Sequence, residues 1–340
     1  MSNPIPLINK SLEEGKIFAV ATVINTWGSS PRPVGSQMWI STEGEMVGSV
    51  SGGCVEGAVV REALGMIEGQ HKGKLLHYGI SNDEAWEVGL SCGGKLDVWL
   101  EVMQEEEKDL WLGFGYNFAQ DIPFVWVNKL DEDTGGHSIW KNGQKVLGQE
   151  LPNEVMEKAK DAFHNREVIQ LSVDDANWLI QPYSKTSTLI VVGAAHLSAE
   201  LVHLANQLGF ETCVIDPRSF FVEGTTFLSQ PDQFHTSYPS EVLKNMDLNP
   251  FTFAAVLSHD PKIDDNALEV MLRSDIAYIG ALGGKKSRAK RQERLLGKGF
   301  SQEEIDRIHQ PIGLNIGAKG AKEIALSIIS QIVQIKNGVK

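Results

Sequence analysis

The sequence predicts an α/β protein, with a doubly wound parallel sheet in its C-terminal part and an α+β domain at its N-terminus. From Thr188 the chain alternates strand and helix patterns, in the order TLIVVGAA, HLSAELVHLANQLG and ETCVIDPR, with further strands over 251–259 and 275–283. A final amphipathic helix is predicted from about Lys319 to Ile335. Such alternation is typical of a Rossmann-like parallel sheet, whose ligand sites lie at the carboxyl ends of the strands.

The N-terminal part is predicted to contain a short helix over 5–15, a buried strand from Ile17, two strands in QMWISTEGEMVGSV and a helix from Cys54 to about Glu68. The middle of the chain mixes strands such as FVWVNKL and WLIQPY with a helix near 153–165. In its predicted hairpin TGGHSIWKNGQKV, His137 is expected to be an exposed loop residue. The acidic stretch 104–112 differs in composition from the residues before it, and we place the first domain boundary there. The predicted divisions are an N-terminal domain over 1–104, a middle α+β segment over 105–183 and a Rossmann-like domain over 184–340.

Composition excludes several classes of protein. The 340 residues include 31 basic and 44 acidic side chains, which gives a net charge of −13 and argues against a nucleic-acid partner. The first residues show no secretory pattern, and no apolar run is long enough to cross a membrane. The three cysteines form no CxxC pair, so we expect reduced thiols, a cytoplasmic location and no structural zinc.

The first of three glycine turns is VVGAAHLS. The G-x-G-x-x-G template falls on Gly193, Ala195 and Ser198, and Asp216 ends the next strand where an acid would bind a ribose. A turn of this kind can bind a phosphate at the helix N-terminus. Ala195 carries a Cβ that hinders the approach of a pyrophosphate, so an altered scaffold without a nucleotide is an equal alternative. His196 is either part of this site or a capping residue.

The second turn carries Gly283 and Gly284 and leads into a strongly basic helix. Lys285, Lys286 and Arg288 would sit in its first turn, where they could bind an anionic ligand. The alternative is a solvated helix face. The complete run of cations is Lys285, Lys286, Arg288, Lys290, Arg291, Arg294 and Lys298.

The third turn places Gly52 and Gly53 before Cys54. A thiol at a helix N-terminus is favoured as a thiolate, which is a nucleophile and a metal ligand. Cys92 has similar surroundings in SCGGK, with Gly93 and Gly94 after it. The alternative is that both are small buried cysteines, as is expected of Cys213 inside a strand.

His259 and Asp260 end a predicted strand, and Asp264 and Asp265 follow within one helical turn. A histidine with carboxylates could bind a metal or act in acid–base chemistry. The alternative is that Asp264 or Asp265 caps the next helix.

Taken together and in this order, the motifs resemble the XdhC/CoxI family of xanthine dehydrogenase accessory proteins. The matching segments are GSSPRPVGSQMWI, GSVSGGCVEGAVVREA, GLSCGGKLDVWLE, TLIVVGAAHLSAEL, VIDPR, AAVLSHDPKIDDNAL, YIGALGGKKSRAKRQERL and PIGLNIGAKGAKEIALSI. The resemblance covers about 12–103 and 188–338. Two departures are GAAH where the family commonly has GAGH, and GGKK where it commonly has GSRR.

The resemblance implies a non-catalytic assembly factor. Such proteins bind molybdenum cofactor, support its sulfuration and deliver it to a molybdenum hydroxylase, so a hydroxylase and a sulfur donor are the implied partners. Cys54 and Cys92 are the candidate metal ligands, and Arg32 could pair with an anionic oxygen. The remaining candidate cofactor-binding residues are Gly52, Gly53, Gly93, Gly94, Gly193, His196, Asp216, His259, Asp260, Gly283, Gly284, Lys285, Lys286 and Arg288.

Two other functions stay open at this point. One is an NAD(P)-dependent oxidoreductase on the same scaffold, and the other is a thiol-dependent carrier of metal or sulfur. A homodimer is also predicted, because each domain would leave a sheet edge or a glycine-rich cleft to cover.

Overall fold

The computed structural model describes residues 3–28, 32–79, 94–133, 135–141, 144–218 and 227–339. The chain forms two compact units, Met1–Ser184 and Lys185–Lys340. The N-terminal unit contains both the segment over 1–104 and the middle segment, and the C-terminal unit contains the parallel sheet. The finer three-part division into family domains stays a prediction.

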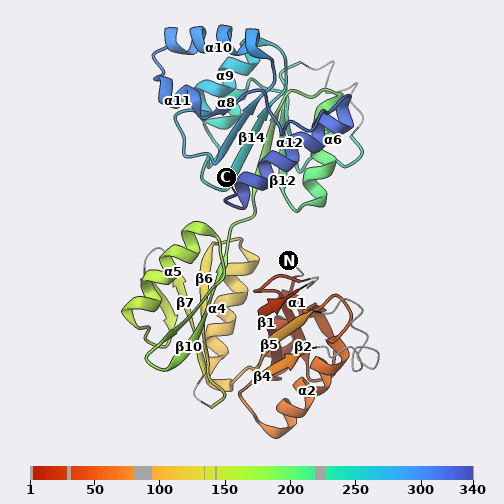
Figure 1. The fold of residues 1–340 in the computed structure, drawn as a ribbon, viewed down its shortest axis with the longest axis vertical. Helices are drawn as coiled ribbons and strands as arrows, with labels where there is room; N and C mark the ends of the chain where they lie inside the picture. The colour runs from red at the N-terminus through yellow and green to blue at the C-terminus, as the bar shows by residue number, and fades with distance from the viewer. Residues whose placement is uncertain are drawn as a thin grey trace. The chain divides into compact units, whose positions relative to one another are not determined.

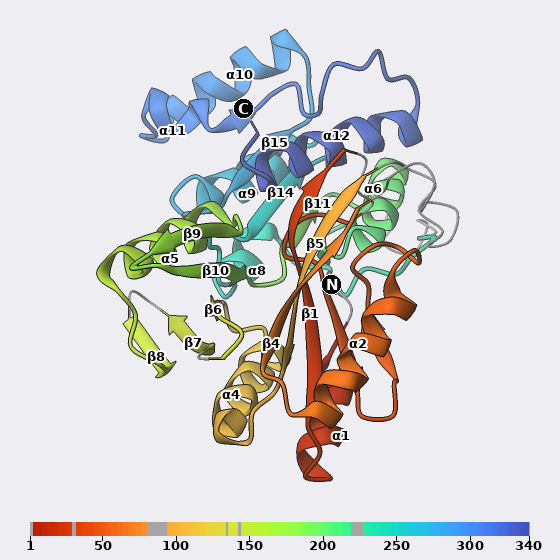
Figure 2. The ribbon, with the colours of Figure 1, turned by 60° about the horizontal axis from the view of Figure 1, so that its bottom comes forward.

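The first sheet of the N-terminal unit is antiparallel and follows the order β3-β2-β1-β5-β4. Alternate residues of its central strand point to opposite faces, as the pleat requires. Ala19, Ala21 and Val23 pack toward helix α2, which lies along the sheet in Figure 2, whereas Phe18 and Val20 belong to the core on the other face. The element bounds are β1 Phe18–Trp27, β2 Gln37–Ser41, β3 Met46–Gly48, β4 Gly73–Tyr78, β5 Lys95–Val102 and α2 Glu56–Gly69.

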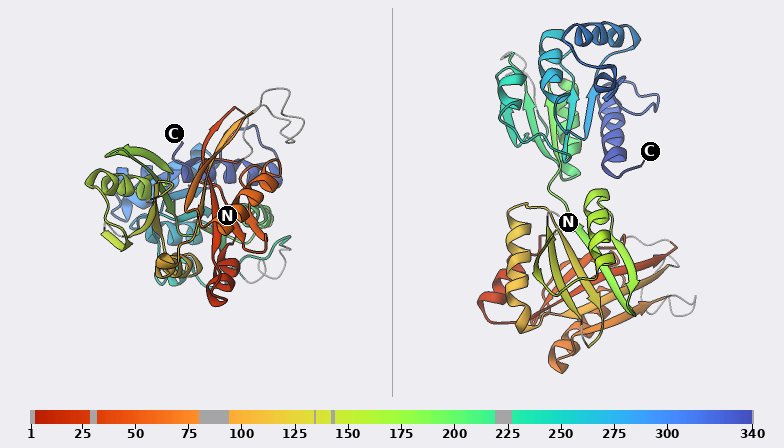
Figure 3. Two further views of the ribbon diagram at one scale, coloured as in Figure 1. Left: turned by 90° about the horizontal axis from the view of Figure 1, so that it is seen from below. Right: turned by 90° about the vertical axis from the view of Figure 1, so that its left-hand side faces the viewer.

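A second antiparallel sheet, in the order β8-β7-β6-β10-β9, is built by the middle segment. Helix α5 packs on one of its faces and α4 on the other, as Figure 1 and the right-hand view of Figure 3 show. The bounds are α4 Lys108–Ala119, β6 Phe124–Leu130, β7 Gly136–Lys141, β8 Gln144–Gly148, α5 Asn153–Asn165, β9 Ile169–Val173 and β10 Ala176–Tyr183.

The two sheets share one aromatic core. Trp111 and Phe114 of α4 contact Trp39 of the first sheet and Trp126 of the second. Helix α1 (Ile5–Glu13) adds side chains to this core, and a short 3-10 helix (Glu105–Glu107) directly precedes α4. The acidic stretch therefore opens a helix whose apolar face is central to the unit.

His137 corrects one expectation from the sequence. It is 6% exposed and lies in β7, where its ring stacks on Trp126 with centroids 4.7 Å apart. Its Nε2 lies 3.0 Å from Glu101 and its Nδ1 lies 2.8 Å from Glu107. The polar side chain is buried because two carboxylates satisfy both ring nitrogens.

The C-terminal unit confirms the predicted doubly wound parallel sheet. Its strand order is β13-β12-β11-β14-β15-β16, with every pairing parallel. Helices α6 and α12 cover one face, and α8 to α11 cover the other (Figure 1). The strands are β11 Thr188–Val192, β12 Glu211–Ile215, β13 Gln233–His235, β14 Thr252–Val256, β15 Tyr278–Ala281 and β16 Ile308–His309. The helices are α6 His196–Gln207, α8 Pro239–Leu243, α9 Pro261–Met271, α10 Lys285–Gly297, α11 Gln302–Asp306 and α12 Ala321–Lys336.

Among the helices of the described residues, none combines the length and the apolar character needed to cross a membrane.

Candidate functional site

The turn before Cys54 is closed by a carboxylate of the helix that follows it. Gly52 and Gly53 have φ angles of +81° and +118°, a region that glycine adopts readily. Their N–H groups donate to the Glu56 carboxylate at 3.1 and 2.9 Å. The N–H of Cys54 donates to the Ser51 hydroxyl at 3.0 Å. The backbone that presents Cys54 is thus fixed by internal hydrogen bonds.

The side chain of Glu56 is buried, with 6% of the residue exposed, and its carboxylate accepts several hydrogen bonds. Besides the two glycines, it accepts hydrogen bonds from the hydroxyls of Ser49 and Ser51, both at 2.6 Å. Burial alone would raise the pKa of Glu56, but these hydrogen bonds outweigh it and lower the pKa to about 2. Because this anion already occupies the N–H groups of Gly52 and Gly53, an incoming phosphate would have to displace it. The direct roles predicted for these two glycines stay predictions.

Cys54 is partly exposed, in contrast to Cys213, which is fully buried in β12 as predicted. Burial raises the pKa of Cys213 to about 12, so this thiol is inert. Cys92 and Gly93 lie outside the described residues, and Gly94 directly precedes β5. The pairing of Cys54 with Cys92 as metal ligands therefore stays a prediction.

A cavity of about 350 Å³ adjoins this turn. Ser49 belongs to both, because it lines the cavity and its hydroxyl also accepts the N–H of Gly52 at 2.8 Å. Arg32, the predicted anion-binding residue of the proline-rich loop, lines the same cavity. The cavity and the Cys54 turn are therefore neighbours within one compact unit.

The middle segment supplies further residues that line this cavity, and no sequence motif predicts them. Arg166 follows the end of α5, and Gln181 and Tyr183 lie in β10. Gln181 donates to the carbonyl of Gly35 at 2.9 Å, and Tyr183 donates to Gln37 at 2.6 Å. These contacts join positions 146 residues apart in the chain, and no local pattern marks them.

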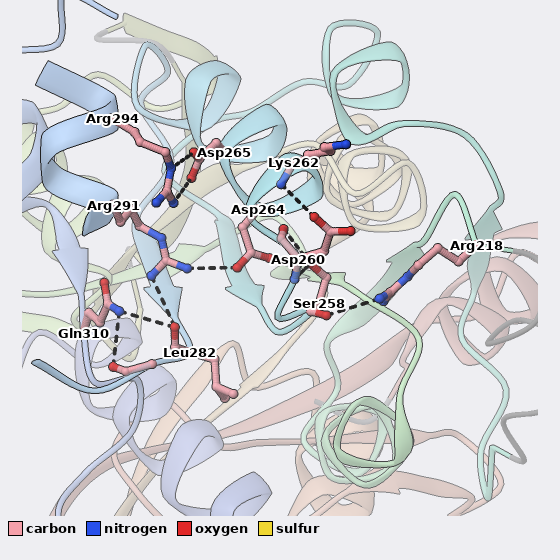
Figure 4. A network of polar contacts seen from close by, with 11 residues as sticks. Arg218, Ser258, Asp260, Lys262, Asp264, Asp265, Leu282, Arg291, Arg294 and Gln310 are labelled. Carbon is pink, nitrogen blue, oxygen red and sulfur yellow. Dashed lines mark hydrogen bonds and ion pairs between the residues drawn. The ribbon is translucent and has the colours of Figure 1, made fainter. Parts of the chain in front are cut away.

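In the C-terminal unit, the glycine turn of β11 lies at the point where the strand order reverses. Asp216, fully buried at the end of β12, accepts the N–H of Ala194 at 2.7 Å and forms an ion pair with Arg218 at 2.8 Å. Burial favours the neutral acid, yet the hydrogen bonds from Arg218 and Ala194 lower the pKa of Asp216. Arg218 also reaches the carbonyl of Ser258 at 3.3 Å, across the switch point (Figure 4). The acid predicted to bind a ribose is thus already engaged by protein groups.

The residues after β14 lie at the same edge of the sheet. His259 is exposed and has a φ of +61°, and Asp260 caps α9 by accepting the N–H of Lys262 at 2.9 Å (Figure 4). His196 is also exposed, at the start of α6. Within the described residues, no group of three or more His, Cys, Asp or Glu side chains is placed to hold a metal.

Asp264 and Asp265 do not cap this helix, which corrects one of the two interpretations of these residues. Asp264 pairs with the buried Arg291 at 2.9 Å, and Asp265 pairs with Arg294 at 2.5 Å (Figure 4). Burial raises the pKa of Asp264 despite its partner. Both carboxylates bind α9 to the basic helix α10.

The basic helix is therefore divided into two parts. Arg291 and Arg294 in its C-terminal half, together with Lys298 directly after its end, pair with acids of α9, the last of them with Glu269. Its first turn, after Gly283 and Gly284, presents three exposed cations, and their binding role stays a prediction. These are Lys285, Lys286 and Arg288.

Comparisons with known proteins agree with both units. A model described as the XdhC Rossmann domain matches residues 189–332, and one described as the XdhC and CoxI family matches residues 11–79. A Bacillus subtilis protein, named as a probable subunit of xanthine dehydrogenase, is 26% identical over all of this chain and 99% of its own length. The Escherichia coli "Molybdenum cofactor insertion chaperone PaoD" is 23% identical, over 96% of this chain and 86% of its own length.

A solved structure from Bacillus halodurans, described as a xanthine dehydrogenase, matches with a TM-score of 0.74 and 25% identity, covering 100% of this chain and 97% of that one. Both halves of the chain are thus matched in sequence, and its whole length is matched in structure. The chain belongs to the XdhC/CoxI family.

Proposed function

We propose that this protein binds molybdenum cofactor, protects it while its terminal sulfido ligand is installed, and delivers it to a xanthine dehydrogenase-type hydroxylase. The names of its relatives support a role in the maturation of this cofactor. The observation that carries the proposal is the hydrogen-bonded turn before the partly exposed Cys54, which Ser49 joins to a cavity lined by two arginines.

The residues present fit the cofactor, which is a metal–dithiolene pterin with a phosphate. Cys54 offers a soft sulfur ligand, the type that thiophilic metals prefer. Arg32 and Arg166 offer guanidinium groups, which bind phosphate oxygens well. The bound cofactor would supply the metal chemistry, and the protein's residues would hold the cofactor and shield it.

The alternative of an NAD(P)-dependent oxidoreductase has less support. A dinucleotide at the β11 turn would have to compete for Asp216, which already accepts a hydrogen bond from the Ala194 N–H and forms an ion pair with Arg218. The third function, a carrier of metal or sulfur on Cys54, differs in predicting persulfide or metal on the thiol without a bound pterin.

The proposal includes a cytoplasmic location, a sulfur donor and a molybdenum hydroxylase as partners, and a homodimer. It includes no catalytic turnover, no nucleic-acid partner and no membrane partner.

The test is purification of the full chain from a molybdenum-replete host, followed by analysis of metal and pterin and by transfer to an apo-hydroxylase. We expect retained cofactor that activates the hydroxylase. Cys54→Ser should lower the molybdenum content at least about ten-fold, while the control Cys213→Ala, at a buried thiol, should not. Protein that neither retains cofactor nor activates the hydroxylase would contradict the proposal.

A further inference from the structure

We propose that the cavity walled by Arg32, Arg166 and Gln181 binds the phosphate-bearing pterin end of the cofactor, with Arg166 of the middle segment as a phosphate ligand. This inference rests on the proposed function and assigns a binding role to a segment that carries no motif. Ser49 lines this cavity and also bonds the turn before Cys54, so the proposal places the metal end of the cofactor on the side of that turn.

The charge of the cavity favours an anion. The protein carries a net charge of −13, yet the described residues that line this cavity include two arginines and no carboxylate. A guanidinium has five N–H donors, so each arginine can bind a ligand oxygen while it keeps a contact with the protein. A local excess of positive charge on an acidic protein is expected where an anionic ligand binds.

Arg166 has an unusual backbone conformation. It follows the last turn of α5 with a φ of +60°, a left-handed conformation that costs a non-glycine residue free energy. Glycine is the common residue at this position of a helix end. Burial lowers the pKa of Arg166, so the cation gains by pairing with an anion.

Gln181 adds a directional polar group to the cavity wall. It is 1% exposed, and its Nε2 is oriented by the bond to the Gly35 carbonyl. Its Oε1 is buried and has no hydrogen-bond partner among the described residues. A buried acceptor of this kind calls for a donor, and a pterin ring carries N–H donors.

The remaining wall suits a planar ring. Trp39, Phe118 and Tyr183 line the cavity beside the polar groups. A volume of about 350 Å³ lies within the range of pockets for small molecules. Aromatic walls with a few oriented polar groups are typical of sites for heterocyclic ligands.

The experiment measures the affinity of the full chain for two probes, the molybdenum-containing cofactor and its metal-free pterin phosphate. Arg166→Gly is the main variant, because glycine accepts the left-handed backbone and should keep the fold. Gln70→Gly is the matched control, since Gln70 is an exposed residue with a φ of +55° at the end of α2. Thermal unfolding of each variant confirms that the fold is intact.

We expect Arg166→Gly to weaken binding of both probes about ten-fold or more, with Gln70→Gly unchanged. The affinity of the wild type should fall more steeply with salt than that of Arg166→Gly. Cys54→Ser should weaken only the molybdenum-containing form.

Two results would overturn the inference in different ways. If the wild type binds the cofactor and Arg166→Gly binds both probes as tightly as Gln70→Gly does, the inference fails and the proposed function stands. If the wild type binds neither probe, the proposed function itself fails.

Discussion

The Glu56 carboxylate accepts two hydrogen bonds from Ser51, one from its backbone N–H at 2.9 Å and one from its hydroxyl at 2.6 Å. Residue 56 opens helix α2, and residue 51 belongs to the turn before it. The helix therefore holds in place the turn that directly precedes Cys54.

Replacement of this acid should destabilise the turn and change the response to pH. Because the pKa of Glu56 is lowered to about 2 from an ordinary value of 4.5, its contribution is complete above about pH 4.5 and is lost as the pH falls toward 2. A shift of this size corresponds to about 3 kcal/mol of stability at neutral pH. Glu56→Gln should therefore lower the free energy of unfolding at pH 7 and flatten its dependence on acid pH, as measured by denaturant titration.

The matched control is Glu62→Gln on the same helix. Glu62 forms an exposed ion pair with Lys74, so its loss should cost less than about 1 kcal/mol. Equal effects of the two substitutions would argue against a special role of Glu56.

His137 should stabilise the N-terminal unit as a cation. Burial opposes its charge, but Glu101 and Glu107 outweigh this and raise the pKa of His137 to about 10. Because the pKa is raised, the protonated His137 contributes its full stabilisation below about pH 6.5, and this contribution is lost as the pH rises toward 10. His137→Gln leaves the buried Glu101 and the partly buried Glu107 without a cation and should cost about 3–5 kcal/mol near neutral pH, as read from urea unfolding.

The exposed His77 beside Asp97 provides the comparison for this prediction. His77→Gln should change stability little. If the wild type were no less stable at pH 9.5 than at pH 6.5, the charged state assigned to His137 would be wrong.

Gly193 should be intolerant of any side chain, whatever ligand binds nearby. Its φ is +105°, and an added Cβ would lie 2.7 Å from the backbone of Ser258. We expect Gly193→Ala to cost about 3 kcal/mol or more. Gly209→Ala, with a φ of +74° and nothing within 4 Å, should cost only about 1–2 kcal/mol.

Thermal unfolding of the two alanine variants is the measurement, and equal costs would contradict the close contact with Ser258. The same contact means that loss of nucleotide binding in a Gly193→Val variant would not identify a dinucleotide site, because the turn itself would be disrupted. A nicotinamide titration should instead use Arg218→Ala, which removes the ion pair of Asp216 and leaves Gly193 unchanged.

The parallel sheet could be predicted from the sequence because its information is local. Each strand, glycine turn and helix follows directly in the chain, from Thr188 to α12. The closure of the Cys54 turn is also local, since Glu56 follows Gly53 by three positions, and a carboxylate that reaches back to turn N–H groups resembles a helix cap. A glycine turn before a helix equally suits a bound phosphate, so the pattern by itself does not identify which anion the turn holds.

The cavity and the buried histidine could not be predicted, because their partners come from distant segments. Arg166 and Gln181 meet the loop around Gly35 only once the two antiparallel sheets share a core. The sequence around His137 predicts a hairpin loop, whereas its burial depends on Glu101 and Glu107, which no periodicity associates with it.

The bonds from Gln181 to Gly35 and from Tyr183 to Gln37 have a consequence for engineering. A chimera that takes residues 105–183 from a relative receives only one partner of each of these two hydrogen bonds. The segment that contains Gly35 and Gln37 should therefore be exchanged together with residues 105–183, so that both partners of each hydrogen bond come from the same protein.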